Sequence, residues 1–273
     1  MKKLSLLSFL LVFSMFLSAC GTSEESNGNG SDEGSSEEKK TLRVVTDAAY
    51  APFESMDGDK IVGFDVDFVN AVAKEAGYEV EIVNVGWDPL FVEVKDKIAD
   101  FGMSAITIND DRKQTYDFSH PYFLSTNKIL VPEGSDIKTA ADLKGKKVAV
   151  QNGTTGQEAV EGLLGANNKD IKKFENTVLA IMELKGGGAD AVVADNTVVE
   201  EYAKNNPGDK LVVIEDTGAF EGEYYGLMFP KGSELKQEID EAINAIYENG
   251  TYAEIYNEWF GTDPDLEDLK AQQ

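Results

Sequence analysis

The chain has 273 residues, a formal net charge of −25 at pH 7 and one cysteine, at position 20. Such an acidic chain repels phosphate backbones and anionic lipid headgroups, which excludes nucleic acid as a partner and favours cationic solutes. A single cysteine excludes an internal disulfide and a metal site built on thiolates. We expect neither a metal nor a cofactor.

Residues 1–19 have the pattern of a lipoprotein signal peptide. Lys2 and Lys3 precede an apolar stretch over residues 4–17, which is shorter than the roughly 20 residues of a membrane-spanning helix. Leu-Ser-Ala stands directly before Cys20, where a peptidase would cut and a lipid would be attached. The pattern predicts a mature chain that begins at Cys20, is palmitoylated there and lies outside the cytoplasmic membrane of a Gram-positive bacterium.

A flexible acidic linker is predicted for residues 20–40. After Cys20 this segment consists of Ser, Gly, Asn, Glu and other polar residues without an apolar side chain, so it cannot offset the entropy cost of folding. As a random coil it would hold the folded part on the order of 25 Å from the membrane. The folded part is expected to begin near Thr41.

Apolar β-branched runs alternate with amphipathic stretches from there on, which predicts an α/β fold with helices on a largely parallel sheet. The expected strands of a first series are 42–46, 79–85 and 99–103. Asp65 is expected to cap a helix that ends at Gly77, and Asp88 to cap a short helix with Pro89 in its first turn.

A second series follows Tyr122, so the chain is predicted to form two lobes. Its expected strands are 128–131, 147–150, 189–194 and 211–214, and its expected helices are 155–164, 177–184 and 196–203. Apolar spacing also predicts helices over 235–247 and 252–259 at the end of the chain.

Two strand-to-helix turns are suited to bind an anion. Residues 104–107 follow a predicted strand and lead into a helix start with Arg112, and residues 151–156, which include Thr154 and Thr155, repeat this arrangement. Free N–H groups at helix starts favour an anion, and an arginine adds a two-pronged hydrogen bond to a carboxylate. The other interpretation is a solvated arginine and turns that only cap helices.

Acidic and aromatic side chains follow other strands of the predicted sheets. Asp195 could hold an ammonium group or cap the next helix, and Trp87 could line a site or belong to the core. Tyr50 and Trp87 could sandwich a cation, and Asp47 could pair with its charge. Because open α/β sheets bind ligands at the carboxyl ends of their strands, these residues predict a site for a free amino acid.

The chain resembles the polar amino acid-binding proteins of ATP-driven importers over nearly all of residues 41–264. The resemblance rests on segments such as Asp-Ala-Ala-Tyr-Ala-Pro-Phe-Glu at 47–54 and Gly-Phe-Asp-Val-Asp at 63–67, and on residues 104–112, 153–155, 189–191 and 248–261. It implies a type II periplasmic-binding-protein-like fold, with two crossing hinge strands and the ligand in the cleft between the lobes. Lobe 1 would comprise residues 41–126 and 224–273, and lobe 2 residues 127–223.

The resemblance assigns the candidate residues to the parts of a bound amino acid. The carboxylate is assigned to Arg112 and to the N–H groups of Thr107 and Thr155. The ammonium group is assigned to Asp195, the Thr107 hydroxyl and the carbonyl of Ser104 or Ala105. The side chain is assigned to a slot between Tyr50 and Trp87, with Asp47 and Gln151 at its far end.

A basic amino acid is the expected ligand. Glutamine-binding members of the family have a lysine at the position of Gln151 and a histidine at that of Ala194, so this chain lacks two basic groups there. Residues 86–90 and 154–158 resemble arginine-, lysine- and histidine-binding members. Arginine is therefore predicted, with glutamine as the alternative.

The resemblance implies a monomeric binding protein that closes on its ligand and delivers it to an ABC permease, with no catalytic residue. One rival is a dehydratase-like enzyme on the same fold, with Asp47, Glu54 or Asp195 as acid or base. Another is the outer domain of a receptor, which would need a spanning helix that this sequence does not show after its signal peptide.

Overall fold

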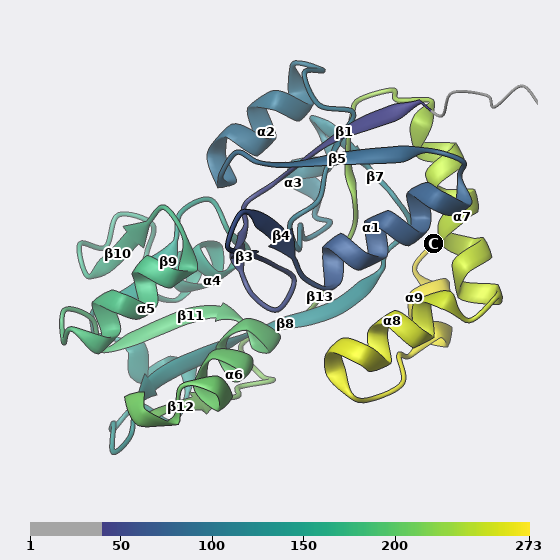
Figure 1. Cartoon of the computed structure of the whole chain (residues 1–273). Coiled ribbons are helices and arrows are strands. Elements are labelled where there is room, and N and C mark those ends of the chain that lie inside the picture. Colours follow the sequence, from purple (N-terminus) through teal and green to yellow (C-terminus); the bar gives the residue numbers. More distant parts are fainter. Residues whose placement is uncertain (1–39) are drawn as a thin grey trace, which may run out of the picture. The chain divides into compact units, whose positions relative to one another are not determined.

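The computed structural model describes residues 40–273, so the predicted signal peptide, Cys20 and nearly all of the predicted linker lie outside the described residues. Two sheets, each flanked by helices, form two lobes (Figure 1). None of the helices within residues 40–273 is both long and apolar enough to span a membrane. The predicted two-lobed α/β fold is confirmed.

The first lobe is built on a five-stranded sheet, in which β1 pairs in parallel with β5 and β6 while β14 is antiparallel to β6 and β7. In sheet order the strands are β5 (Glu79–Asn84), β1 (Thr41–Thr46), β6 (Phe101–Gly102), β14 (Met228–Pro230) and β7 (Tyr116–Phe118). Its helices are α1 (Phe64–Glu75), α2 (Trp87–Lys95), α3 (Asp110–Lys113), α7 (Leu235–Glu248), α8 (Thr251–Phe260) and α9 (Leu266–Ala271).

The second lobe is built on a six-stranded sheet with parallel strands at one side and antiparallel strands at the other. In sheet order the strands are β10 (Ile171–Phe174), β9 (Val148–Gln151), β11 (Ala191–Asp195), β8 (Phe123–Pro132) and β12 (Leu211–Ile214), and β13 (Gly222–Tyr225) also pairs with β8. Its helices are α4 (Thr155–Leu164), α5 (Thr177–Lys185) and α6 (Asn196–Asn205), with 3₁₀ turns at Ala140–Leu143 and Pro207–Asp209.

A small antiparallel sheet follows β1 and was not predicted. It consists of β2 (Ala49–Tyr50), β3 (Glu54–Asp57) and β4 (Lys60–Val62). These strands are too short for a period-2 pattern to show in the sequence. Their importance is positional, because β2 carries Tyr50 and β3 begins at Glu54.

Strands β8 and β13 connect the two lobes. The beginning of β8 pairs with β13, and its later residues pair with β11 and β12. Phe123 accordingly packs in a core of the first lobe, whereas Ile129 and Val131 pack in a core of the second. The predicted lobe boundaries at 126/127 and 223/224 fall inside these strands and stay a prediction.

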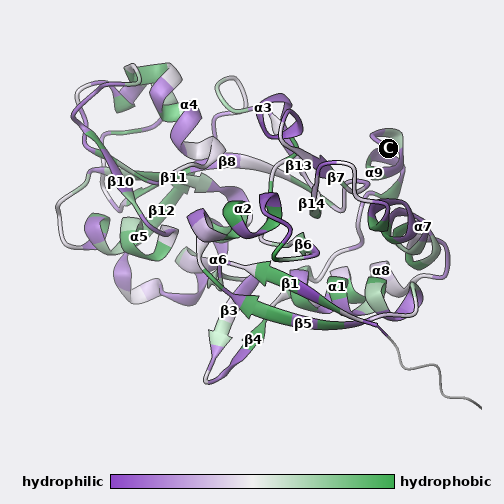
Figure 2. Ribbon diagram, turned by 90° about the horizontal axis from the view of Figure 1, so that it is seen from above, coloured by the Kyte–Doolittle hydropathy of each residue, from purple (hydrophilic) through white to green (hydrophobic). Residues whose placement is uncertain are grey.

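Figure 2 shows strands β1, β5 and β11 as largely hydrophobic, whereas the helices carry both hydrophobic and hydrophilic residues. Helix α1 places Phe68, Val69 and Val72 in the core at helical spacing, as expected. Its predicted cap is wrong: the N-cap is Gly63, because the Asp65 side chain is fully buried and bonded elsewhere. The cap of α2 is likewise Gly86, and its backbone conformation at φ 83 suits a glycine better than the predicted Asp88.

Candidate functional site

One cavity of about 430 Å³, counted as space free of protein atoms and partly open to solvent, lies at the ends of strands from both sheets. All eleven residues that the sequence assigned to a ligand line it: Asp47, Tyr50, Trp87, Ser104, Ala105, Thr107, Arg112, Gln151, Thr154, Thr155 and Asp195. Their role in binding stays a prediction.

The topology explains why residues so distant in sequence meet here. Asp47 follows β1, Trp87 follows β5, and the 104–107 turn follows β6 of the first sheet. Gln151 ends β9 and Asp195 ends β11 of the second sheet. In parallel sheets these carboxyl ends share one edge, and the two edges face the same cavity.

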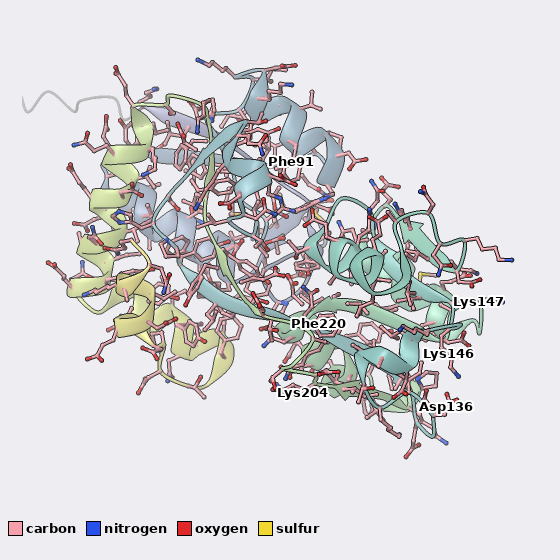
Figure 3. All side chains as sticks on the ribbon, turned by 180° about the vertical axis from the view of Figure 1, so that it is seen from behind. Phe91, Asp136, Lys146, Lys147, Lys204 and Phe220 are labelled. Atoms are coloured by element: carbon pink, nitrogen blue, oxygen red, sulfur yellow. The ribbon has the colours of Figure 1, made fainter. Side chains whose placement is uncertain are left out.

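Arg112 packs against two neighbouring aromatic rings and bridges the lobes. Its guanidinium carbon is 5.5 Å from the ring centroid of Trp87 and 5.4 Å from that of Phe91, which Figure 3 labels in the first lobe. Nη1 donates to the Thr107 carbonyl at 2.8 Å, and Nη2 donates to the Gly153 carbonyl at 3.3 Å. Burial lowers the pKa of Arg112, yet the guanidinium remains a cation at neutral pH. A fixed cation in a partly dehydrated cavity is suited to bind a carboxylate.

Asp195 supplies a buried acid on the second lobe. Asp195 is 6% exposed and is the N-cap residue of α6, as one of the two interpretations predicted, but its carboxylate makes no capping bond. Tyr225 donates to its Oδ2 at 2.5 Å. Burial, aided by the charge of Glu223, raises the pKa of Asp195 to about 7, whereas the hydrogen bonds from Tyr225 and Tyr50 and the charge of Arg112 oppose the rise. A ligand ammonium group would stabilise the ionised form.

Replacing Asp195 with asparagine is expected to stabilise the ligand-free protein at about pH 8 by about 2–4 kcal/mol while removing ligand binding. The pKa is raised from 3.8 to about 7, so the contribution of the carboxyl to folding is fully present below pH 3.8 and is lost as the pH rises through 7. Asparagine does not ionise. Denaturant unfolding should therefore show a gain at high pH that disappears near pH 4, and a variant less stable at both pH values would contradict the assignment.

Asp47 supplies a buried acid to the cavity lining from the first lobe. Gln151 Nε2 donates to Asp47 Oδ2 at 3.1 Å, and Thr177 Oγ1 donates to Gln151 Oε1 at 2.8 Å. This chain of bonds joins the end of β1 to the second lobe. Burial raises the pKa of Asp47 to about 6, with the charges of Glu175 and Asp88 adding to the rise and the Gln151 hydrogen bond opposing it. Asp47 is thus bonded to a neutral amide, and its carboxylate could pair with a cationic group of a ligand.

Two fully buried acids form hydrogen bonds with the 104–107 turn. Ser104 Oγ donates to Glu54 Oε1 at 2.7 Å, and the N–H of Ala105 donates to Asp65 Oδ2 at 2.9 Å. Tyr122 donates to the same Asp65 oxygen at 2.7 Å. Burial, together with the charge of Asp65, raises the pKa of Glu54 well above its usual range, and burial raises the pKa of Asp65 to about 6. These bonds fix Ala105 at φ 46, a conformation that non-glycine residues rarely adopt.

Tyr50 and Trp87 both belong to the cavity wall. Trp87 is 7% exposed and packs edge-on against Phe91 at 4.8 Å between ring centroids, so it is both a core residue and a lining residue. Tyr50 stacks against Phe53 at 6.3 Å. Gly153 lies so close to Trp87 that a Cβ there would be 3.2 Å from Nε1.

Sequence reasoning missed three polar residues of the site. Asn127 and Thr177 also line the cavity, and Glu223 contacts three lining side chains from outside it. Asn127 and Glu223 lie on the strands β8 and β13 that connect the lobes, where no turn or helix start marks a functional position.

The chain matches the model of the bacterial extracellular solute-binding proteins, family 3, over residues 42–262. It is 42% identical over 251 residues to the "Probable histidine-binding protein" of Neisseria gonorrhoeae, with 89% of this chain and 90% of that protein covered. It is 35% identical over 263 residues to the arginine-binding extracellular protein ArtP of Bacillus subtilis (strain 168), with 95% and 98% covered.

A solved structure agrees with these relatives. The arginine-, lysine-, histidine-binding protein ArtJ from the thermophilic bacterium Geobacillus stearothermophilus is similar with a TM-score of 0.83 and 58% identity, and the match covers 85% of this chain and all of that one. The resemblance predicted from the sequence is confirmed, and this chain belongs to the bacterial extracellular solute-binding proteins, family 3.

Proposed function

We propose that this protein binds a free amino acid with a cationic side chain, arginine before lysine or histidine, and delivers it to an ABC permease. The observation that carries the proposal is the charge of the cavity lining, where Arg112 lies together with the buried acids Asp47 and Asp195. A basic amino acid has one anionic and two cationic groups, which match this set one for one. The names of the histidine-, arginine- and ArtJ-type relatives support the same ligand class.

Closure of the lobes is the proposed mechanism. Contacts from Gln151 to Asp47 and from Arg112 to Gly153 join the turns of the two sheets around the cavity. A ligand that bonds to both sets of turns stabilises the closed form by its differential contacts, and the permease would respond to that form.

The predicted lipid at Cys20 remains part of the proposal and would keep the protein at the outer face of the membrane. A Cys20→Ala variant should be released into the medium with its ligand binding intact. Retention of that variant on the cell surface would refute the anchor without affecting the binding proposal.

Binding without catalysis is proposed because pairing with the ligand accounts for both acids of the lining. The rival dehydratase would use one of them as an acid or base and would release a changed product. Mass spectrometry of ligand recovered from the protein distinguishes the two: intact amino acid supports the binding protein, and a dehydrated acid supports the enzyme.

Thermal-shift screening of the ligand-free protein against the common amino acids tests the ligand class. A ligand at about 100 times its dissociation constant adds about 2.7 kcal/mol to the stability. Arginine, lysine and histidine should give the largest shifts. A larger shift with glutamine would support the alternative, a glutamine-binding protein of the same family. No shift with any amino acid would refute the proposal.

Affinity for arginine relative to glutamine is expected to depend on pH through Asp47. Its pKa of about 6 means that the carboxylate that attracts the cation is present above that pH and becomes protonated below it. Asp195 faces the ammonium group common to both ligands, so its titration cancels in the ratio. Calorimetry should give a constant ratio above about pH 7 and a fall of up to about tenfold per pH unit below about pH 6. A ratio independent of pH would contradict the role of Asp47.

A further inference from the structure

Glu223 on β13 gathers three side chains of the cavity wall without lining the cavity itself. Its Oε2 accepts from Thr107 Oγ1 at 2.8 Å and from Thr155 Oγ1 at 2.7 Å. Its Oε1 accepts from Asn127 Nδ2 at 2.8 Å. Thr107 follows a strand of the first sheet and Thr155 begins a helix on the second, so a single carboxylate oxygen joins the two lobes.

These bonds decide what the cavity wall offers to a ligand. A hydroxyl group has one proton, and when Thr107 and Thr155 donate it to Glu223 their oxygens can only accept. Asn127 turns its Nδ2 toward Glu223, which leaves its buried Oδ1 without a partner within the described residues. The Oδ1 atom is 2.9 Å from the position of a Cβ on Gly156, which also lines the cavity. Three lining side chains are thus held as hydrogen-bond acceptors.

We propose that Glu223 is a positioning residue that makes this part of the cavity select the ligand's ammonium group. An ammonium group has only hydrogen-bond donors, so it can bond to oxygens that can only accept. A carboxylate has only acceptors and cannot bond to them. The arrangement exists only when the lobes are close enough for both threonines to reach the same oxygen, so recognition of the ammonium group is completed by closure. The inference rests on the proposed function, because it assumes that an amino acid occupies the cavity.

Calorimetry with two ligands tests this role: arginine, and the same molecule without its α-amino group. Glu223→Ala frees both hydroxyl protons, so arginine should bind about tenfold or more weakly while the analogue loses less than about threefold. Equal losses for the two ligands would mean a merely structural role and would overturn the proposal. Glu221→Ala is the matched control, since this exposed acid lies two residues earlier and should change neither affinity.

Glu223→Gln separates hydrogen bonding from charge. Glutamine Oε1 can accept both hydroxyl protons, and its Nε2 can donate to Asn127 Oδ1 once that amide turns. Because the turned amide places Nδ2 where Oδ1 stood, only the two hydroxyl acceptors are kept, so arginine should lose some affinity but clearly less than with Glu223→Ala. A loss as large as that of Glu223→Ala would overturn the proposal, because the charge alone would then be responsible.

Thr155→Val keeps the test valid if Glu223→Ala does not fold. Valine has nearly the same shape as threonine and removes one acceptor, so it should reduce arginine affinity more than that of the analogue. Equal reduction would overturn the proposal. If the wild type prefers glutamine, the same comparison uses glutamine and its analogue without the amino group. If it binds no amino acid, the proposed function itself fails, which is a separate result.

Discussion

Arginine, lysine, histidine and glutamine are all expected to bind on the order of a thousandfold more weakly to Arg112→Ala than to the wild type. The guanidinium packs against Trp87 and Phe91 and is bonded to carbonyls of both lobes, so it is positioned before the ligand arrives. Its removal leaves the ligand carboxylate in a dehydrated cavity with only N–H groups as partners. The loss is uniform because every free amino acid has the same carboxylate.

Isothermal titration calorimetry of the four ligands measures the effect. Lys113→Ala is the matched control, because Lys113 is the next cation of α3 and its side chain is exposed. Arg112→Lys should restore only part of the affinity, since an ammonium cannot make the two-pronged bond. Unchanged binding by Arg112→Ala would refute the assignment of Arg112 to the ligand carboxylate. A loss restricted to basic ligands would show that Arg112 acts on the ligand side chain instead.

Asp47→Asn should change which amino acids bind, not whether they bind. The amide has the size of the carboxylate and can still accept from Gln151, but it has no charge to offer a cationic side chain. Breaking a buried charge pair costs about 2–5 kcal/mol, so arginine and lysine should lose on the order of a hundredfold or more in affinity. Glutamine should bind equally well or better.

The ratio of arginine to glutamine affinity, measured by calorimetry, isolates this effect from any general disturbance. Asp136→Asn is the control: the same chemical change occurs at the outer end of the second lobe, where Asp136 pairs with Lys146 (Figure 3). Equal losses for arginine and glutamine would show that Asp47 supports the cavity structurally and does not distinguish ligands by their charge.

The sequence predicted those features that local patterns determine. Strand ends and helix starts at Asp47, Trp87, Gln151 and Asp195 could be placed because hydrophobic periodicity shows where strands stop, and parallel strands end at a common edge. The assignment of each residue to a part of the ligand came from the family resemblance.

Features that depend on contacts across the fold could not be predicted. Asp65 was predicted to cap a helix, yet it lies in the first turn of α1, where Ala105 and Tyr122 bond to it from segments 40 and 57 residues away. Glu223 has no local signal because its partners lie on three other segments, 116, 96 and 68 residues earlier. Such roles arise when segments distant in sequence come together in the fold, and no window of sequence contains them.

The inventory of charges around the cavity has a consequence for electroneutrality. Its lining carries two acids and one guanidinium, a formal sum of −1 when both acids are ionised. Enclosing arginine, with its net charge of +1, brings the sum to zero, whereas enclosing glutamine leaves −1 away from water and enclosing glutamate leaves −2. Net charge held away from water is unfavourable, so with both acids ionised the enclosed cavity disfavours glutamine and disfavours glutamate more strongly.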